Sequence, residues 1–149
     1  MMVPSHMAFV GGAGALWGLG LEGCAALAIG SAFPDVADSV IAGRNREAWK
    51  GIHRTFSHWP PLYPALLAIL FFSGQAIPEP WAWYSLLFVL GALAHTVLDF
   101  LTPMGIPVIP PFRRRDRVSI PLVRTGTLAD YGLGFAPLIV YLITSYHLI

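Results

Sequence analysis

The sequence predicts an all-α, polytopic membrane protein that forms a single integral-membrane domain over residues 1–149. Hydrophobic residues make up 56% of the chain and charged residues only 11%, whereas soluble domains carry about 25% charged residues. The mean hydropathy is +0.64, and four apolar stretches approach the roughly 20 residues that cross a bilayer as a helix. A soluble enzyme is therefore excluded. The net charge of +1 also leaves no basic face for nucleic acid.

About four transmembrane helices are expected, and the first of them is unusual. The predicted spans run from about Met7 to Phe33, Trp59 to Ile77, Trp81 to Leu101 and Leu128 to Ile149. The first stretch has no basic segment before it, so we interpret it as retained and not as a signal peptide. It contains seven glycines and, in its middle, Glu22. Two interpretations stay open: a simple span with His6 outside, or a broken, re-entrant pair of half-helices that returns His6 to the cytoplasmic side.

The basic residues predict the orientation. All nine fall in the two long loops, and the short turn from Gly74 to Pro80 has none. They are Arg44, Arg46, Lys50, Arg54, Arg113, Arg114, Arg115, Arg117 and Arg124. The positive-inside rule therefore places both loops in the cytoplasm and, with a simple first span, both termini outside. Trp81, Trp83 and Tyr84 fit an aromatic belt at the outer interface.

Ionisable residues other than arginine and lysine gather at the predicted cytoplasmic ends of the spans. These are Asp35, Asp38, His53, His58, His95, Asp99 and Asp130. Imidazole nitrogens and carboxylate oxygens are ligands for zinc, iron or manganese, so their convergence predicts a metal centre at the membrane edge. His95 and Asp99, four residues apart, share one helix face. Asp99 lies in the last turn, where a cation would offset the helix dipole; the alternative is a buried His–Asp hydrogen bond that packs two spans.

The other candidates each have a simpler alternative. His53 and His58 could be exposed loop histidines, and Asp35 could cap a helix. Asp130 near the start of the last helix is favoured by the helix dipole alone. Arg54 offers a planar fork of donors for a phosphate or carboxylate on a substrate. The run from Arg113 to Arg117 is explained by topology and by attraction to anionic lipid headgroups.

Several motifs resemble one known family over nearly the whole chain. The motifs are Pro34-Asp35 with an acid close behind, His53-Arg54-x-Phe56-x-His58, and Gly91 through His95, Asp99 and Thr102-Pro103 to Gly105-Ile106-Pro107. The chain is similar to bacterial inner-membrane proteins described as LexA-regulated, predicted metal-dependent hydrolases. His6 occupies the place of an early histidine in that pattern, and Asp130 that of a late acid. The family usually has Pro-Asp-x-Asp, one residue shorter than here, and a late Glu.

The resemblance implies a hydrolase of the bacterial inner membrane within the SOS response. We expect one or two divalent ions per chain, zinc first and manganese or iron as alternatives. The expected ligands are His6, Asp35, His53, His58, His95 and Asp99. Asp38 or Asp130 would act as general base and Arg54 would hold the substrate, a lipid or lipid-linked phosphoester. The alternative is a non-enzymatic protein whose centre is structural or senses metal; a closed coordination shell would favour it.

Overall fold

The computed structural model describes residues 1–43, 45–73 and 76–146 and confirms the all-α prediction. Arg44, the first residues of the turn from Gly74 and the last residues of the fourth predicted span lie outside this description. The elements are α1 (Val3–Leu16), α2 (Leu21–Ala42), α3 (Arg46–Ile52), η1 (Phe56–His58), α4 (Leu62–Ser73), α5 (Trp81–Phe100), β1 (Ile106–Pro107), η3 (Arg114–Asp116), β2 (Arg117–Val118) and α6 (Leu128–Tyr146).

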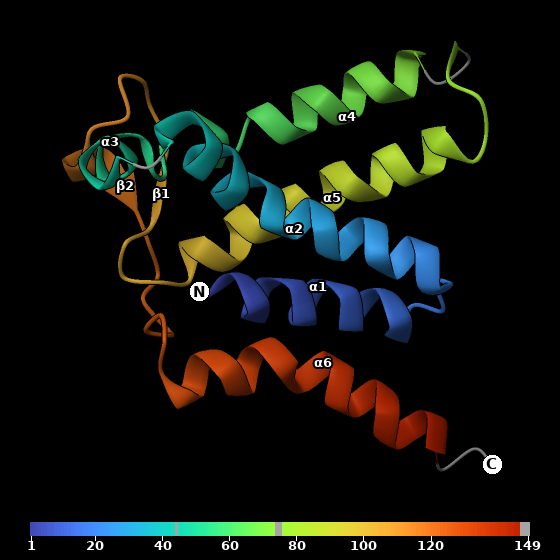
Figure 1. Ribbon diagram of the computed structural model, residues 1–149. Coiled ribbons are helices and arrows are strands. Elements are labelled where there is room, and N and C mark those ends of the chain that lie inside the picture. Colours follow the sequence, from blue (N-terminus) through green and yellow to red (C-terminus); the bar gives the residue numbers. More distant parts are fainter. Residues whose placement is uncertain (44, 74–75, 147–149) are drawn as a thin grey trace.

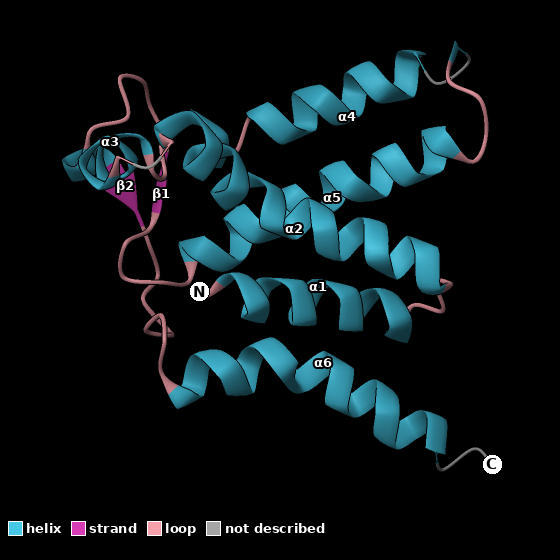
Figure 2. Ribbon diagram, in the orientation of Figure 1, coloured by secondary structure: helices cyan, strands magenta, loops and turns pink. Residues whose placement is uncertain are grey.

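The long helices lie side by side, so the molecule has two distinct ends (Figure 1). One end holds the N-terminus, the ends of α2 and α5, the start of α6, and α3. The short antiparallel sheet of β1 and β2 lies at the same end (Figure 2). The other end holds the turn between α1 and α2 and the connection between α4 and α5. The most extensive packing joins α2 to α5 and α1 to α6.

The first predicted span is broken into two antiparallel helices. Helix α1 ends at Leu16 and α2 begins at Leu21. Gly18 in the turn between them has φ +77°, a left-handed conformation that glycine adopts without steric cost. The interpretation of the first stretch as a broken pair of helices is therefore confirmed. The N-terminus lies at the end where α2 finishes, so the expectation that both termini lie on the opposite side is wrong for the N-terminus.

Among the residues that the structure describes, three helices are long and apolar enough to cross a membrane, namely α2, α5 and α6. The second predicted span contains a shorter helix. Helix α4 has 12 residues and a length of about 18 Å at 1.5 Å per residue, against the roughly 30 Å of hydrocarbon in a bilayer. It begins directly after Pro60 and Pro61, because prolines lack the N–H that a helix interior requires.

Glycines allow α2 and α5 to touch backbone to backbone. A Cβ atom at Gly30 would lie 2.0 Å from the carbonyl oxygen of Phe88, and one at Gly91 would lie 2.1 Å from that of Leu27. Neither contact is possible for a residue with a side chain, and small residues at such crossings are typical of membrane helices. The crossing brings Ser31, in the middle of α2, next to His95 on α5.

Helix α1 is held against α6 in the same way. A Cβ atom at Gly12 would lie 2.5 Å from the backbone nitrogen of Leu138, and one at Gly134 would lie 2.6 Å from the Cβ of Ser5. Helix α1 thus fits between α6 and the pair formed by α2 and α5. This placement carries His6 to the end of α5 that bears Asp99.

Candidate metal centre

The predicted site residues lie buried at one end of the helices. His6, His58, His95 and Asp130 are 0% exposed, and Asp99 is 1% exposed. The side chain of Asp35 is 18% exposed and is the most accessible member of the set. Histidine and carboxylate groups are rarely buried without strong partners, because removing them from water is costly.

Four side-chain atoms from three segments converge on one point. They are Nε2 of His58, Nε2 of His95, Oδ1 of Asp35 and Oδ2 of Asp99. The two nitrogens are 3.1 Å apart. His58 Nε2 lies 3.3 Å from the Asp35 oxygen and 3.5 Å from the Asp99 oxygen. His95 Nε2 lies 3.8 Å and 3.4 Å from the same two oxygens. Four ligands arranged tetrahedrally at zinc-like distances of 2.0–2.1 Å are separated by about 3.3 Å, so the arrangement fits a metal ion.

Hydrogen bonds fix the protonation of both imidazoles. His95 Nδ1 lies 2.6 Å from the carbonyl oxygen of Ser31 and donates to it. Ser57 Oγ donates to Asp38 at 2.5 Å, so this hydroxyl accepts from His58 Nδ1 at 2.9 Å. In a neutral ring each Nδ1 therefore carries the proton, which leaves the lone pair on Nε2, and the two Nε2 atoms are 3.1 Å apart. Burial also lowers the pKa of His58, which favours the neutral ring that a metal requires.

Without a cation this arrangement is unfavourable. The four converging atoms are all hydrogen-bond acceptors, and Asp35 Oδ1 is buried without a hydrogen-bond donor among the described residues. An unpartnered buried acceptor costs free energy, and a charged one costs more. A divalent ion would satisfy all four atoms together, which is the physical basis for assigning a metal centre.

A wider set of ligands surrounds this point. Two groups of three residues could each hold an ion: His6, His95 and Asp99 in one, and Asp35, His53 and His58 in the other. The ring of His6 stacks on His95 with centroids 3.9 Å apart, and its Nε2 lies 3.3 Å from Asp99 Oδ1. His53 Nδ1 lies 3.6 Å from Asp35 Oδ1. All six residues expected as ligands are thus brought together.

Asp38 lies behind the converging atoms and orients them. Its Oδ1 accepts from Ser57 at 2.5 Å. Its Oδ2 accepts from the backbone N–H of Arg54 at 3.1 Å and lies 3.2 Å from Nδ1 of His53. A carboxylate that holds a ligating histidine in place tunes metal affinity from outside the coordination shell.

Arg54 turns into the protein and supports Asp99. Its backbone has φ +58°, an uncommon conformation for a residue with a side chain. Nη2 donates to Asp99 Oδ1 at 2.8 Å, while Nη1 donates to Thr102 Oγ1 at 2.9 Å and to the carbonyl oxygen of Gly105 at 3.0 Å. Within the described chain, Nε is buried without an acceptor, so one donor is still available for another group.

Asp130 is also buried but lies at a different junction. Its Oδ2 accepts from the backbone N–H of Met2 at 3.1 Å and from that of Gly126 at 2.7 Å. These bonds join the start of α1 to the start of α6. The structure therefore places Asp130 beside the chain ends of two helices and not among the converging atoms.

Some supporting residues could not be found from the sequence. Tyr63, which is 1% exposed, donates to the carbonyl oxygen of Ser57, and Arg117 donates to that of His53 at 2.8 Å. Ser31 contributes only its carbonyl group. Ser57 lies within the His53–His58 motif, which is the one local signal. The others act through tertiary contacts that spacing in the sequence does not reveal.

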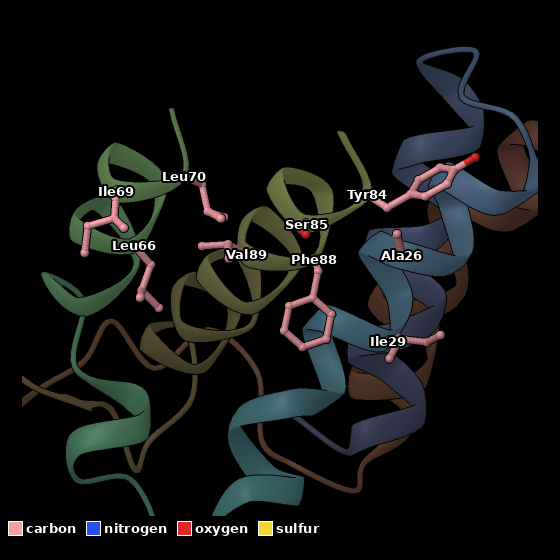
Figure 3. Close-up of a pocket in the computed structure, with 9 residues that line it drawn as sticks. All are labelled: Ala26, Ile29, Leu66, Ile69, Leu70, Tyr84, Ser85, Phe88 and Val89. Atoms are coloured by element: carbon pink, nitrogen blue, oxygen red, sulfur yellow. The ribbon is translucent and has the colours of Figure 1, made fainter. Parts of the chain in front are cut away.

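A large groove elsewhere lacks the chemistry of the centre. Its volume is about 460 Å³ and it lies between α2, α4 and α5 (Figure 3). None of its nine lining residues is a histidine or an acid. Its walls are aliphatic and aromatic side chains, with Tyr84 and Ser85 as polar members. In a membrane, such a surface faces lipid chains.

The comparison with known families agrees with a membrane protein of this architecture. A family model described as YdjM inner membrane protein matches residues 1–148. The match includes every residue of the centre, from His6 to Asp99, and also Asp130. No curated protein matches the chain, and no solved structure does.

Proposed function

The chain belongs to the YdjM inner membrane protein family, and on that premise we propose that it is a membrane-embedded, metal-dependent hydrolase. Its substrate is a lipid or lipid-linked molecule with a phosphoester or other ester bond. The observation that supports the proposal best is the convergence of four buried acceptor atoms from Asp35, His58, His95 and Asp99, with both imidazole protons directed away from the centre.

The donor set fits zinc first, with manganese or iron as alternatives. Two neutral imidazoles and two carboxylates are ligand types of catalytic zinc sites, and each Nε2 lies 3.1–3.8 Å from the other nitrogen and from the two carboxylate oxygens. The group of Asp35, His53 and His58 is the candidate for a second ion. A bound divalent ion supplies Lewis acidity, which activates water and offsets the charge that develops on the cleaved group.

The chain's own residues prepare the site for this chemistry. Arg54 holds one oxygen of Asp99 at 2.8 Å and leaves the other directed at the centre. Both of its Nη atoms are engaged by Asp99, Thr102 and Gly105 and its side chain is 4% exposed, so we assign Arg54 to positioning Asp99 and not to direct contact with the substrate. Of the two carboxylates expected as general base, Asp38 is better placed than Asp130, because it contacts His53 and His58.

The distribution of charge supports a site at the cytoplasmic face of a multi-pass inner-membrane protein. Helix α3 and the connection from α5 to α6, which together carry most of the basic residues, lie at the end that holds the centre. Basic segments stay in the cytoplasm and attract anionic lipid headgroups. A centre at this depth is within reach of the phosphate groups of lipids. Regulation by LexA is supported by the sequence resemblance alone.

One observation favours the alternative of a structural or metal-sensing centre. His58, His95 and Asp99 are at most 1% exposed, as in closed structural sites. The partial exposure of Asp35 argues for an accessible, catalytic centre instead.

The first test is the metal content of the purified protein, measured by mass spectrometry. The wild type is compared with His95→Ala and Asp99→Ala, and with Glu47→Gln as a control that alters an exposed acid outside the centre. We expect near-stoichiometric zinc, manganese or iron in the wild type and the control, and a loss in both alanine variants. Hydrolysis of phosphoester lipids is then screened with the metal-loaded protein. Absence of metal after repletion, in folded protein, would refute the proposal.

A further inference from the structure

The centre can be approached from one edge. On the side of the loops, Arg54 is 3% exposed, His53 is 8% exposed and Thr102 is 0% exposed, so this side is closed. Of the four converging residues, only Asp35 reaches the surface appreciably, with a side chain that is 18% exposed. Any molecule that meets the centre in this conformation must therefore approach along Asp35.

A cavity of about 260 Å³ lies at this edge. It is lined by Val3, Asp35, Val36, Ser39 and Val40. The Ser39 hydroxyl donates to the backbone carbonyl of Asp35 at 2.8 Å, which leaves the Asp35 carboxylate as the polar group at the cavity floor. Asp35 Oδ1 is itself buried and lies 3.3 Å from His58 Nε2, so Asp35 borders both the cavity and the centre.

The wall of the cavity that α2 forms is largely apolar. Val36 is 51% exposed and Val40 is 74% exposed, and both lie on α2, a helix long enough to cross a membrane. Exposed valines on such a helix face lipid chains and not water. The cavity thus combines an apolar wall on α2, which would face the bilayer, with the Asp35 carboxylate of the centre.

We propose that this cavity is a lateral portal through which a phosphate-bearing amphiphile enters the centre from the bilayer. Its anionic head reaches the Asp35 edge and its hydrocarbon chain lies along Val36 and Val40. The inference rests on the proposed function, because an anionic head is attracted to Asp35 only when a cation offsets that carboxylate. The apolar wall offers no hydrogen-bond donor to a water-soluble phosphate ester, whereas each methylene buried there strengthens binding by about fourfold.

The matched test uses two neighbouring residues of α2. Val40 and Ile41 are both 74% exposed, but only Val40 lines the cavity. Val40→Trp would fill the portal, while Ile41→Trp introduces the same side chain on the same helix outside the portal. Val36→Trp is a second portal-filling variant. Each protein is loaded with cobalt(II) in phosphatidylcholine nanodiscs, and its visible absorption is titrated with dodecylphosphonate or methylphosphonate.

We expect dodecylphosphonate to change the cobalt spectrum of the wild type and of Ile41→Trp at similar concentrations. Val40→Trp and Val36→Trp should bind it at least tenfold more weakly while retaining full cobalt. If Val40→Trp and Ile41→Trp bind dodecylphosphonate with equal affinity while both retain cobalt, the portal is overturned but the proposed metal centre is not. A wild type that takes up no cobalt would overturn the proposed function and the portal together, so the two failures are distinguishable.

Discussion

Asp35→Asn offers the sharpest test of the assigned metal centre. Asp35 Oδ1 lies 3.3, 3.6 and 3.8 Å from nitrogens of His58, His53 and His95, and no donor among the described residues satisfies it. The substitution keeps the size of the side chain and removes its charge. Because the side chain is partly exposed, an amide is tolerated there better than at Asp99, whose loss would leave Arg54 buried without its anion.

The size of the effect follows from mass action. Loss of a residue that supports a ligand from outside the coordination shell lowers metal affinity about 10–100-fold, and loss of a ligand should cost at least the upper value. At a free metal concentration of about 100 times the wild-type Kd, metal stabilises the native state by about 2.7 kcal/mol. A 100-fold weaker variant at the same concentration gains only about 0.4 kcal/mol.

Two measurements check this prediction. Metal affinity is obtained by competition with a chromophoric chelator, and stabilisation by thermal unfolding with and without metal. Glu47→Gln removes the same charge from an exposed residue of α3 and should match the wild type in both. The reasoning is refuted if Asp35→Asn keeps the wild-type affinity and stabilisation, or if Glu47→Gln loses as much.

Three further predictions concern the support of the His58 ring, the contact of α2 with α5, and the positions of the two ends of the molecule. Ser57→Ala removes the hydroxyl that links Asp38 to the His58 ring and should weaken metal binding about 10–100-fold; an unchanged Kd in the chelator assay would contradict this. Gly91→Ala forces α2 and α5 apart and should cost about 1–3 kcal/mol in thermal unfolding, whereas Gly51→Ala meets open space and should cause no loss. Cysteines at Glu79 and Arg115, introduced after replacing the native thiol, should react with an impermeant maleimide from opposite sides of the membrane; labelling of both from one side would refute the arrangement of the two ends.

The candidate residues could be predicted from the sequence because their signals are local or compositional. Apolar length identifies α5 and α6 directly, since a helix needs a fixed number of residues to cross hydrocarbon. The four-residue spacing of His95 and Asp99 fixes their common face through helix geometry alone. The alternative that His53 and His58 are exposed loop histidines is wrong, because His53 at the end of α3 is 8% exposed and His58 in η1 is 0% exposed.

The division of roles among those residues could not be predicted, because it depends on distances between segments remote in sequence. Asp38 and Asp130 looked alike as candidate bases, yet one contacts the imidazoles and the other joins α1 to α6. The position of His6 depended on whether the first apolar stretch folds back, which the packing of α1 between α2 and α6 decides.

The sequence by itself predicted a helical membrane protein whose histidine and aspartate side chains gather at one end of its helices, because hydropathy and residue type are properties of the chain. Only the tertiary structure determined which imidazole nitrogens and carboxylate oxygens lie close together. The contact of α2 with α5 at Gly30 and Gly91 sets the Ser31 carbonyl against His95 Nδ1, and that hydrogen bond turns Nε2 toward His58. A histidine nitrogen can bind a metal only when packing directs its lone pair toward the metal site. The spacing of residues in the sequence does not determine that direction.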